Sequence, residues 1–152
     1  MIIPSWLGRF ETQPDKVDAL GKVGQRRDAP ASIAQEISPG VKGLISRLDL
    51  TRVLPSDLIT VAQGLCKEGF MSLDVYYRFR DATRDGDGTP RAEIPFDFLG
   101  EVREGARQVR AMARQGGDFR PEKYYAEFSL SARGLTYLAA SIKGVKVVDI
   151  RA

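Results

Sequence analysis

Residues 54–79 read LPSDLITVAQGLCKEGFMSLDVYYRF and predict two consecutive helices separated by a glycine. In the first half, apolar residues recur at spacings of three and four, which places them on one helix face. They are Leu58, Val61, Ala62, Leu65 and Cys66. Asp57 suits the positive end of the helix dipole, Lys67 suits the negative end, and Gly69 favours the left-handed conformation that ends a helix. The stretch therefore predicts a mainly α fold.

The second helix of this stretch carries apolar residues on two sides. Ser72 is its expected N-cap. One stripe consists of Met71, Val75, Phe79 and Ala82, and the other of Leu73, Tyr76 and Tyr77. A helix that is apolar on two sides needs two neighbours. These are either two helices of the same fold, or one helix and a partner subunit.

Two further helices flank this pair. Ser38 and Pro39 form a cap and first turn before an apolar stripe. That stripe consists of Val41, Leu44, Ile45 and Leu48. Pro95 and Asp97 begin a longer helix that ends at Gly116 and Gly117. Its inward residues are Phe98, Val102, Ala106, Val109 and Ala113.

The C-terminal part of the chain predicts a strand, a helix and a second strand. Residues 123–131, KYYAEFSLS, alternate between two sides as a half-buried strand does. A helix follows, with Leu135, Leu138, Ala139 and Ile142 inward, and Gly144 ends it. The sequence VKVVDI, residues 145–150, predicts a terminal strand.

The N-terminal residues predict an arm and a tether. The start, MIIPSWLGRF, concentrates Trp6, Leu7 and Phe10 before a polar stretch, within which Val17, Leu20 and Val23 favour a short helix after Asp15. We expect residues 1–37 to form an N-terminal arm and polar tether, and residues 38–152 to form one helical domain. The predicted fold is a compact bundle of about five helices with one or two short C-terminal β-strands.

Composition excludes several classes of enzyme. The 152 residues include no histidine and one cysteine, so Ser-His-Asp, Cys-His and histidine-metal catalysis are excluded. Cys66 lies on an apolar helix face, where we expect a buried thiol without a catalytic role. No apolar run reaches the roughly 18 residues of a membrane span, and the start lacks the pattern of a signal peptide. We expect a cytoplasmic protein with no catalytic residue, metal or cofactor.

The loop TRDGDGTPRAE, residues 83–93, is similar to a calcium-binding EF-hand loop. When Gly88 is aligned with the glycine of that motif, Asp85 and Asp87 fall at ligand positions. Thr83 and Ile94, however, stand where carboxylates are required. The loop therefore predicts a polar surface turn, for which glycine and aspartate are the usual residues.

The outward side of the helix beginning near residue 97 carries Arg103, Arg107, Arg110 and Arg114 at spacings of four, three and four. Such a strip can contact phosphates or an acidic partner. It can equally be a solvated helix face, because Glu101 and Glu104 dilute the positive field and Glu104 can pair with an arginine three residues later.

From residue 49 to about residue 117 the chain resembles small helical proteins of bacteria. The resemblance rests on LPSDLITVAQGL, CKEGFMSLDVYYRF and PFDFLGEVREGARQVRAMARQGGD. The pattern of helix, Gly69, apolar residue, Ser72 and helix is similar to the SHOCT-type oligomerisation module. The resemblance implies a helix pair that packs or self-associates.

The segment FSLSARGLTYLAA, residues 128–140, is similar to the wing and C-terminal helix of winged-helix transcription regulators. This resemblance implies a wing strand over residues 125–130, a cap at Ser131 and a close-packing glycine at Gly134. The helix that carries the four arginines would then be the recognition helix.

The sequence thus favours a non-enzymatic interaction or adaptor protein that binds another protein or a second copy of itself. The expected interface consists of Trp6, Leu7, Phe10, Leu73, Tyr76 and Tyr77. Tyrosine pairs such as Tyr124 and Tyr125 can stack on bases or ligands, although core packing is the more common role. The alternative is a winged-helix-like DNA-binding regulator that uses the four arginines.

Overall fold

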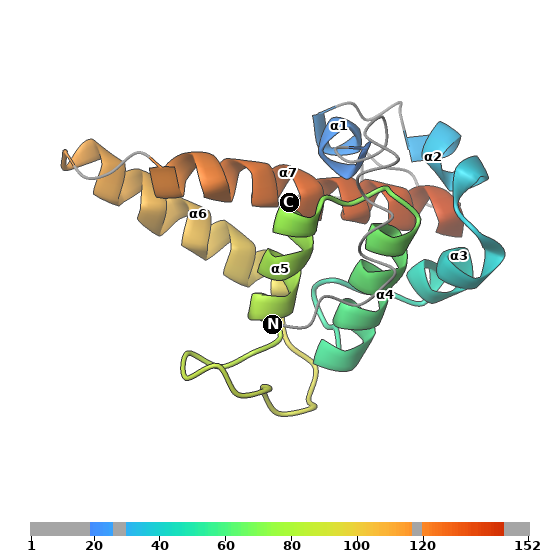
Figure 1. The fold of residues 1–152 in the computed structure, drawn as a ribbon, viewed down its shortest axis with the longest axis horizontal. Helices are drawn as coiled ribbons and strands as arrows, with labels where there is room; N and C mark the ends of the chain where they lie inside the picture. Colours follow the sequence, from blue (N-terminus) through green and yellow to red (C-terminus); the bar gives the residue numbers. More distant parts are fainter. Residues whose placement is uncertain (1–18, 26–29, 117–119, 145–152) are drawn as a thin grey trace.

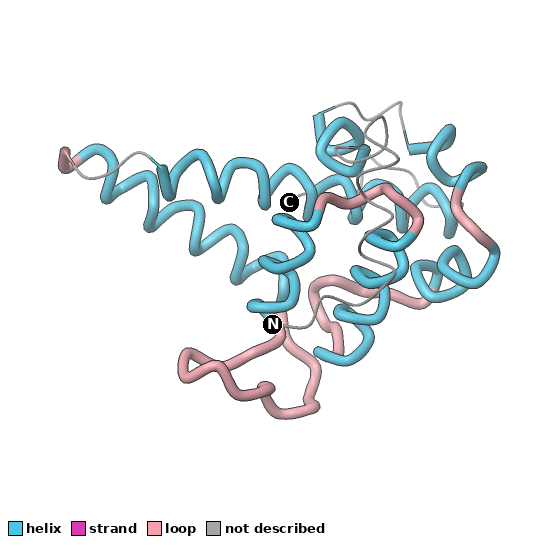
Figure 2. The backbone as a smooth tube through the Cα atoms, viewed as in Figure 1, coloured by secondary structure: helices cyan, strands magenta, loops and turns pink. Residues whose placement is uncertain are grey.

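The computed structural model describes residues 19–25, 30–116 and 120–144, which form seven helices and no strand (Figures 1 and 2). The helices are α1 (Ala19–Gln25), α2 (Pro30–Glu36), α3 (Pro39–Ser46), α4 (Pro55–Lys67), α5 (Leu73–Ala82), α6 (Phe98–Arg114) and α7 (Arg120–Lys143). The predicted mainly α class is confirmed. No helix in the described ranges is long and apolar enough to cross a membrane.

Helix α7 organises the fold. It contacts α1, α2, α3, α5 and α6. In the view of Figure 1, α1 and α2 lie above α7, and α3, α4 and α5 lie below it. Helix α6 runs beside the N-terminal half of α7, and these two helices project from the body as a hairpin.

The predicted strand over residues 123–131 is wrong, because these residues lie within α7. The strand prediction relied on alternation over nine residues. From Phe128 onward, however, buried residues recur at helical spacing, through Ala132 and Leu135 to Leu138 and Ala139. Packing of this stripe against several helices outweighs the short alternating pattern. The second predicted strand, over residues 145–150, lies outside the described residues.

Helix ends agree with the predicted caps. Ser38, Ser72 and Asp97 each accept a hydrogen bond from the backbone N–H three residues later, at 3.4, 3.2 and 2.9 Å. Gly69 and Gly116 follow α4 and α6 with φ of 84° and 83°. Local capping chemistry therefore fixes where α3, α5 and α6 begin, and a left-handed glycine follows α4 and α6.

The described residues before residue 38 form α1 and α2 and carry buried apolar side chains. Leu20 and Val23 of α1 are buried, as are Ile33, Ala34 and Ile37 in and after α2. These side chains belong to the same core as those of α3–α7. Helices α1 and α2 thus share one core with α3–α7, the predicted boundary at residue 38 stays a prediction, and residues 1–18 lie outside the described part.

Three phenylalanines join α5, α6 and α7. Phe79, Phe98 and Phe128 are all buried. The ring centroid of Phe79 lies 5.1 Å from that of Phe98 and 5.2 Å from that of Phe128, and the latter two are 5.9 Å apart. Because each ring comes from a different helix, the cluster fixes the relative positions of the three helices.

Candidate functional site

The four predicted arginines of α6 form a continuous exposed surface, here called the arginine strip (Arg103, Arg107, Arg110 and Arg114). At 3.6 residues per turn they fall within about 60° of the helix circumference and extend over about 16 Å. Together with Ala111 they line a groove with a volume of about 500 Å³. The strip lies on the hairpin that projects from the body.

The carboxylates of α6 are turned away from most of the strip. Glu101 and Glu104 lie on another side of the helix, about 150° and about 90° from the centre of the strip. Glu101 accepts two hydrogen bonds from Arg91, at 3.1 and 3.2 Å, and Glu104 pairs with Arg107. Within the described part of the chain, the other three arginines of the strip make no ion pair. The two carboxylates thus neutralise the strip less than the sequence suggested.

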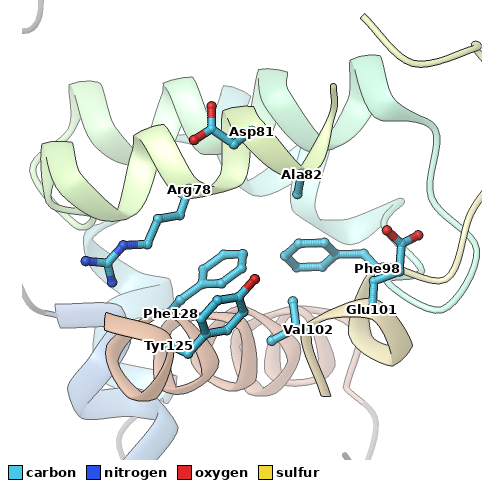
Figure 3. Close-up of a pocket in the computed structure, with 8 residues that line it drawn as sticks. All are labelled: Arg78, Asp81, Ala82, Phe98, Glu101, Val102, Tyr125 and Phe128. Atoms are coloured by element: carbon cyan, nitrogen blue, oxygen red, sulfur yellow. The ribbon is translucent and has the colours of Figure 1, made fainter. Parts of the chain in front are cut away.

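A second candidate site lies where α5, α6 and α7 meet (Figure 3). This aromatic cleft has a volume of about 260 Å³. Phe98, Tyr125 and Phe128 supply aromatic walls, and Arg78, Asp81 and Glu101 supply charge; Ala82 and Val102 complete the lining. Tyr125 is positioned by Gly105 of α6, where a Cβ atom would come within 2.6 Å of the tyrosine ring. A residue larger than glycine would displace that ring.

Charge in the aromatic cleft is unevenly distributed. The side chain of Arg78 is only 6% exposed, and its guanidinium lies 3.6 Å from Glu127. The side chains of Asp81 and Glu101 are 63% and 53% exposed, and they pair with Arg80 and Arg91. A buried arginine is costly unless its charge is balanced. The cleft therefore combines one buried cation with two carboxylates at its rim.

The predicted protein interface is only partly described. Trp6, Leu7 and Phe10 lie outside the described residues. Tyr76 is 7% exposed and belongs to the core. Leu73 and Tyr77 are half-buried, and the Arg80 guanidinium lies 4.6 Å from the centre of the Tyr77 ring. Helices α4 and α7 both pack against α5 and cover Tyr76, and its role as a contact residue stays a prediction.

The loop that resembles a calcium site is a closed turn, as predicted. The backbone N–H of Asp85 donates to the carbonyl of Thr89 at 2.8 Å. Thr89 donates to one carboxylate oxygen of Asp87 from its backbone N–H, at 3.1 Å, and its hydroxyl, at 2.6 Å. These bonds hold the pKa of Asp87 below its usual value. No group of three or more His, Cys, Asp or Glu side chains that could hold a metal occurs in the described ranges.

Cys66 is fully buried in α4, and burial raises the pKa of its thiol to about 12. Since the thiolate is the reactive form, we expect no reaction of the folded protein with Ellman's reagent at pH 8, and one thiol per chain after addition of denaturant.

The raised pKa of Cys66 also makes stability depend on pH. Between pH 9.0 and about pH 12, the thiol has lost its proton in the unfolded chain but keeps it in the folded chain. The free energy of unfolding should therefore fall with pH in this window, less steeply for Cys66→Ala. Rapid labelling under native conditions would contradict the burial.

The aromatic cleft was not predicted from the sequence. Arg78 follows Val75 by three residues and precedes Ala82 by four, so it falls on an apolar stripe of α5. A charged residue on such a stripe was the available signal. The alternating pattern of residues 123–131 predicts a strand for Tyr125 and Phe128, and a strand gives no indication that these residues lie near α5. Comparisons with protein families, curated proteins and solved structures found no match for this chain, and the SHOCT-type resemblance stays a prediction.

Proposed function

We propose that this protein is a non-enzymatic binding protein whose arginine strip docks an acidic segment of a protein partner. The separation of charge around α6 is the observation that supports this function. A linear row of guanidinium groups can bind carboxylates that are repeated along a helix or an extended segment. Each guanidinium can donate two parallel hydrogen bonds to one carboxylate. The strip belongs to the projecting hairpin, which leaves room for a partner along α6.

A partner protein is favoured over duplex DNA for two reasons. A helix inserted into the major groove has phosphates on both sides, so Glu101 and Glu104 would face one of the two DNA strands. The wing strand expected over residues 125–130 is helical. The absence of histidine and the buried thiol of Cys66 support a binding role without catalysis. The N-terminal arm with Trp6, Leu7 and Phe10 remains a predicted second contact.

Replacing all four arginines of the strip with glutamine is expected to weaken binding to an acidic polypeptide by about tenfold to a hundredfold. Each exposed ion pair contributes about 0.2–1 kcal/mol, and four act together. Fluorescence anisotropy with labelled short poly-L-glutamate at low salt measures the effect. Random-sequence duplex DNA of similar charge, under the same buffer, provides the comparison.

The matched control changes Arg47, Arg52, Arg84 and Arg133 to glutamine, because these arginines are also exposed and the change in net charge is identical. This control should retain most of the affinity for poly-L-glutamate. Equal losses in the two quadruple variants would mean that net charge, not the strip, determines binding. Tighter binding of DNA than of poly-L-glutamate, lost only in the strip variant, would favour a nucleic-acid partner instead.

A further inference from the structure

Opposite charge is concentrated in two neighbouring segments of the chain. Residues 83–97, which join α5 to α6 and are here called the acidic loop, contain four carboxylates and two arginines, a net charge of −2. Residues 103–114, which include the arginine strip, contain four arginines and one glutamate, a net charge of +3. The chain thus carries both an exposed cationic helix face and an acidic segment that is complementary to it.

The acidic loop is held in one conformation. The backbone N–H of Phe96 donates to the carbonyl of Val53, and the N–H of Val53 donates to the carbonyl of Phe96, both at 3.0 Å. The N–H and the hydroxyl of Ser56 donate to the carboxylate of Glu93. Because the loop is already ordered, binding a partner costs it little conformational entropy.

Two carboxylates at the tip of the acidic loop are available to a partner. Asp85 and Asp87 are exposed, and neither forms an ion pair within the described part of the chain. Both hydrogen bonds from Thr89 reach the same oxygen of Asp87, so the other oxygen can accept from a guanidinium.

One copy of the chain does not bring the loop and the strip together. Arg91 ties the acidic loop to Glu101 in the first turn of α6, on a side about 150° from the centre of the strip. Arg107, Arg110 and Arg114 lie about 9–20 Å farther along the helix. In Figure 1 the loop extends below the body, whereas α6 continues to the end of the hairpin. Among the described residues, no ion pair joins the loop to the strip.

From this separation of charge we infer that the acidic partner of the arginine strip is a second copy of this chain, bound with its α6 antiparallel to the first. A two-fold axis then places the acidic loop, at the start of each α6, beside the C-terminal part of the other α6, where the strip lies. Asp85 and Asp87 of each copy meet the strip of the other. Two equal contacts form at once, so the assembly closes as a dimer. This inference rests on the proposed function and names its partner.

Sedimentation velocity on the full chain tests for the dimer. At low salt we expect a monomer–dimer equilibrium without larger species. At high salt the dissociation constant of the dimer should rise at least about tenfold, because salt screens exposed ion pairs.

Charge reversal identifies the two surfaces. The loop variant is Asp85→Lys/Asp87→Lys, and the strip variant is Arg107→Glu/Arg110→Glu. Each alone should dimerise at least about tenfold more weakly than the original chain, because like charges then face each other in both contacts. An equimolar mixture of the two variants should restore the dimer, since both contacts then join opposite charges. Asp85→Lys alone keeps the bonds between Thr89 and Asp87 and should still weaken the dimer.

Asp57→Lys/Asp74→Lys is the matched control for the loop variant, because it makes the same change in net charge at exposed positions outside the acidic loop. It should keep most of the dimer. Mixed with the strip variant, it should form less dimer than the loop variant does in the same mixture, because only one of the two contacts is then favourable. Circular dichroism verifies that each variant is folded.

The inference is overturned if the original chain is a monomer at low salt or grows beyond a dimer, if the loop variant loses no more association than its control, or if mixing the two reversed variants restores nothing. The proposed function is decided separately by poly-L-glutamate. A chain that stays monomeric while its strip still binds poly-L-glutamate overturns this inference alone, whereas loss of both results overturns both.

Discussion

Gly134→Ala is expected to lower the free energy of unfolding by about 3 kcal/mol, a typical to high cost for overpacking a core. A Cβ atom at residue 134 would lie 1.9 Å from the carbonyl oxygen of Leu20. That oxygen belongs to the backbone of α1, so no side chain can rotate to relieve the contact. The whole of α1 must move away from α7, which also uncovers Leu20 and Val23.

The same crossing includes a second glycine. A Cβ atom at Gly24 of α1 would lie 2.1 Å from the carbonyl oxygen of Leu130 in α7. The backbones of the two helices therefore approach each other at Gly24 and Gly134, where the absence of side chains permits contact. Because either substitution separates the same helix pair, we expect the double variant to lose less than the sum of the two single losses.

Gly21→Ala is the control for this prediction. Gly21 also lies in α1, yet nothing stands within 4 Å of a Cβ atom there. Alanine favours a helix over glycine by up to about 1 kcal/mol, so this variant should be as stable as the original chain or slightly more stable. Urea unfolding followed by circular dichroism measures the three single variants and the double variant. An unchanged midpoint for Gly134→Ala would mean that α1 does not pack closely on α7.

Local chemistry made α3–α6 predictable. Ser38, Ser72 and Asp97 are short-range caps, so the residues that fix these helix starts are adjacent in the sequence. The inward stripes of α4 and α5 follow the same helical period. The exposed position of the arginine strip followed from that period as well, because its residues face away from Phe98 and Val102.

Long-range contacts explain what could not be predicted. A helix of seven residues such as α1 is marginal alone, and it is held by its crossing with α7 far along the chain. The sequence marks Gly134 as a small residue but does not reveal that Gly24 lies opposite. The aromatic cleft depends likewise on three helices, so its charge arrangement arises only when Arg78, Glu101 and Tyr125 are brought together. Periodicity describes one helix at a time and cannot place such residues relative to one another.

Phe79→Ala is expected to lower the free energy of unfolding by about 3–5 kcal/mol. Phe79 is fully buried and contacts the rings of Phe98 and Phe128. Truncation removes the ring from α5 and leaves a cavity between α6 and α7, which close-packed helices fill only partly. Since single domains are stable by about 5–15 kcal/mol, the loss is a large fraction of the total. Urea unfolding at 25 °C measures it.

Two variants show whether the cluster, not simply an aromatic ring, produces this loss. Phe96→Ala makes the same chemical change at a half-buried ring that stacks on Arg91 and meets Phe98 at 6.4 Å. Its loss should be clearly smaller because solvent already reaches that side chain. Phe79→Leu keeps most of the buried volume and should lie between the two alanine variants. If Phe79→Ala and Phe96→Ala cost the same, the three rings do not form the junction that positions α5, α6 and α7, and the aromatic cleft loses the support on which its geometry depends.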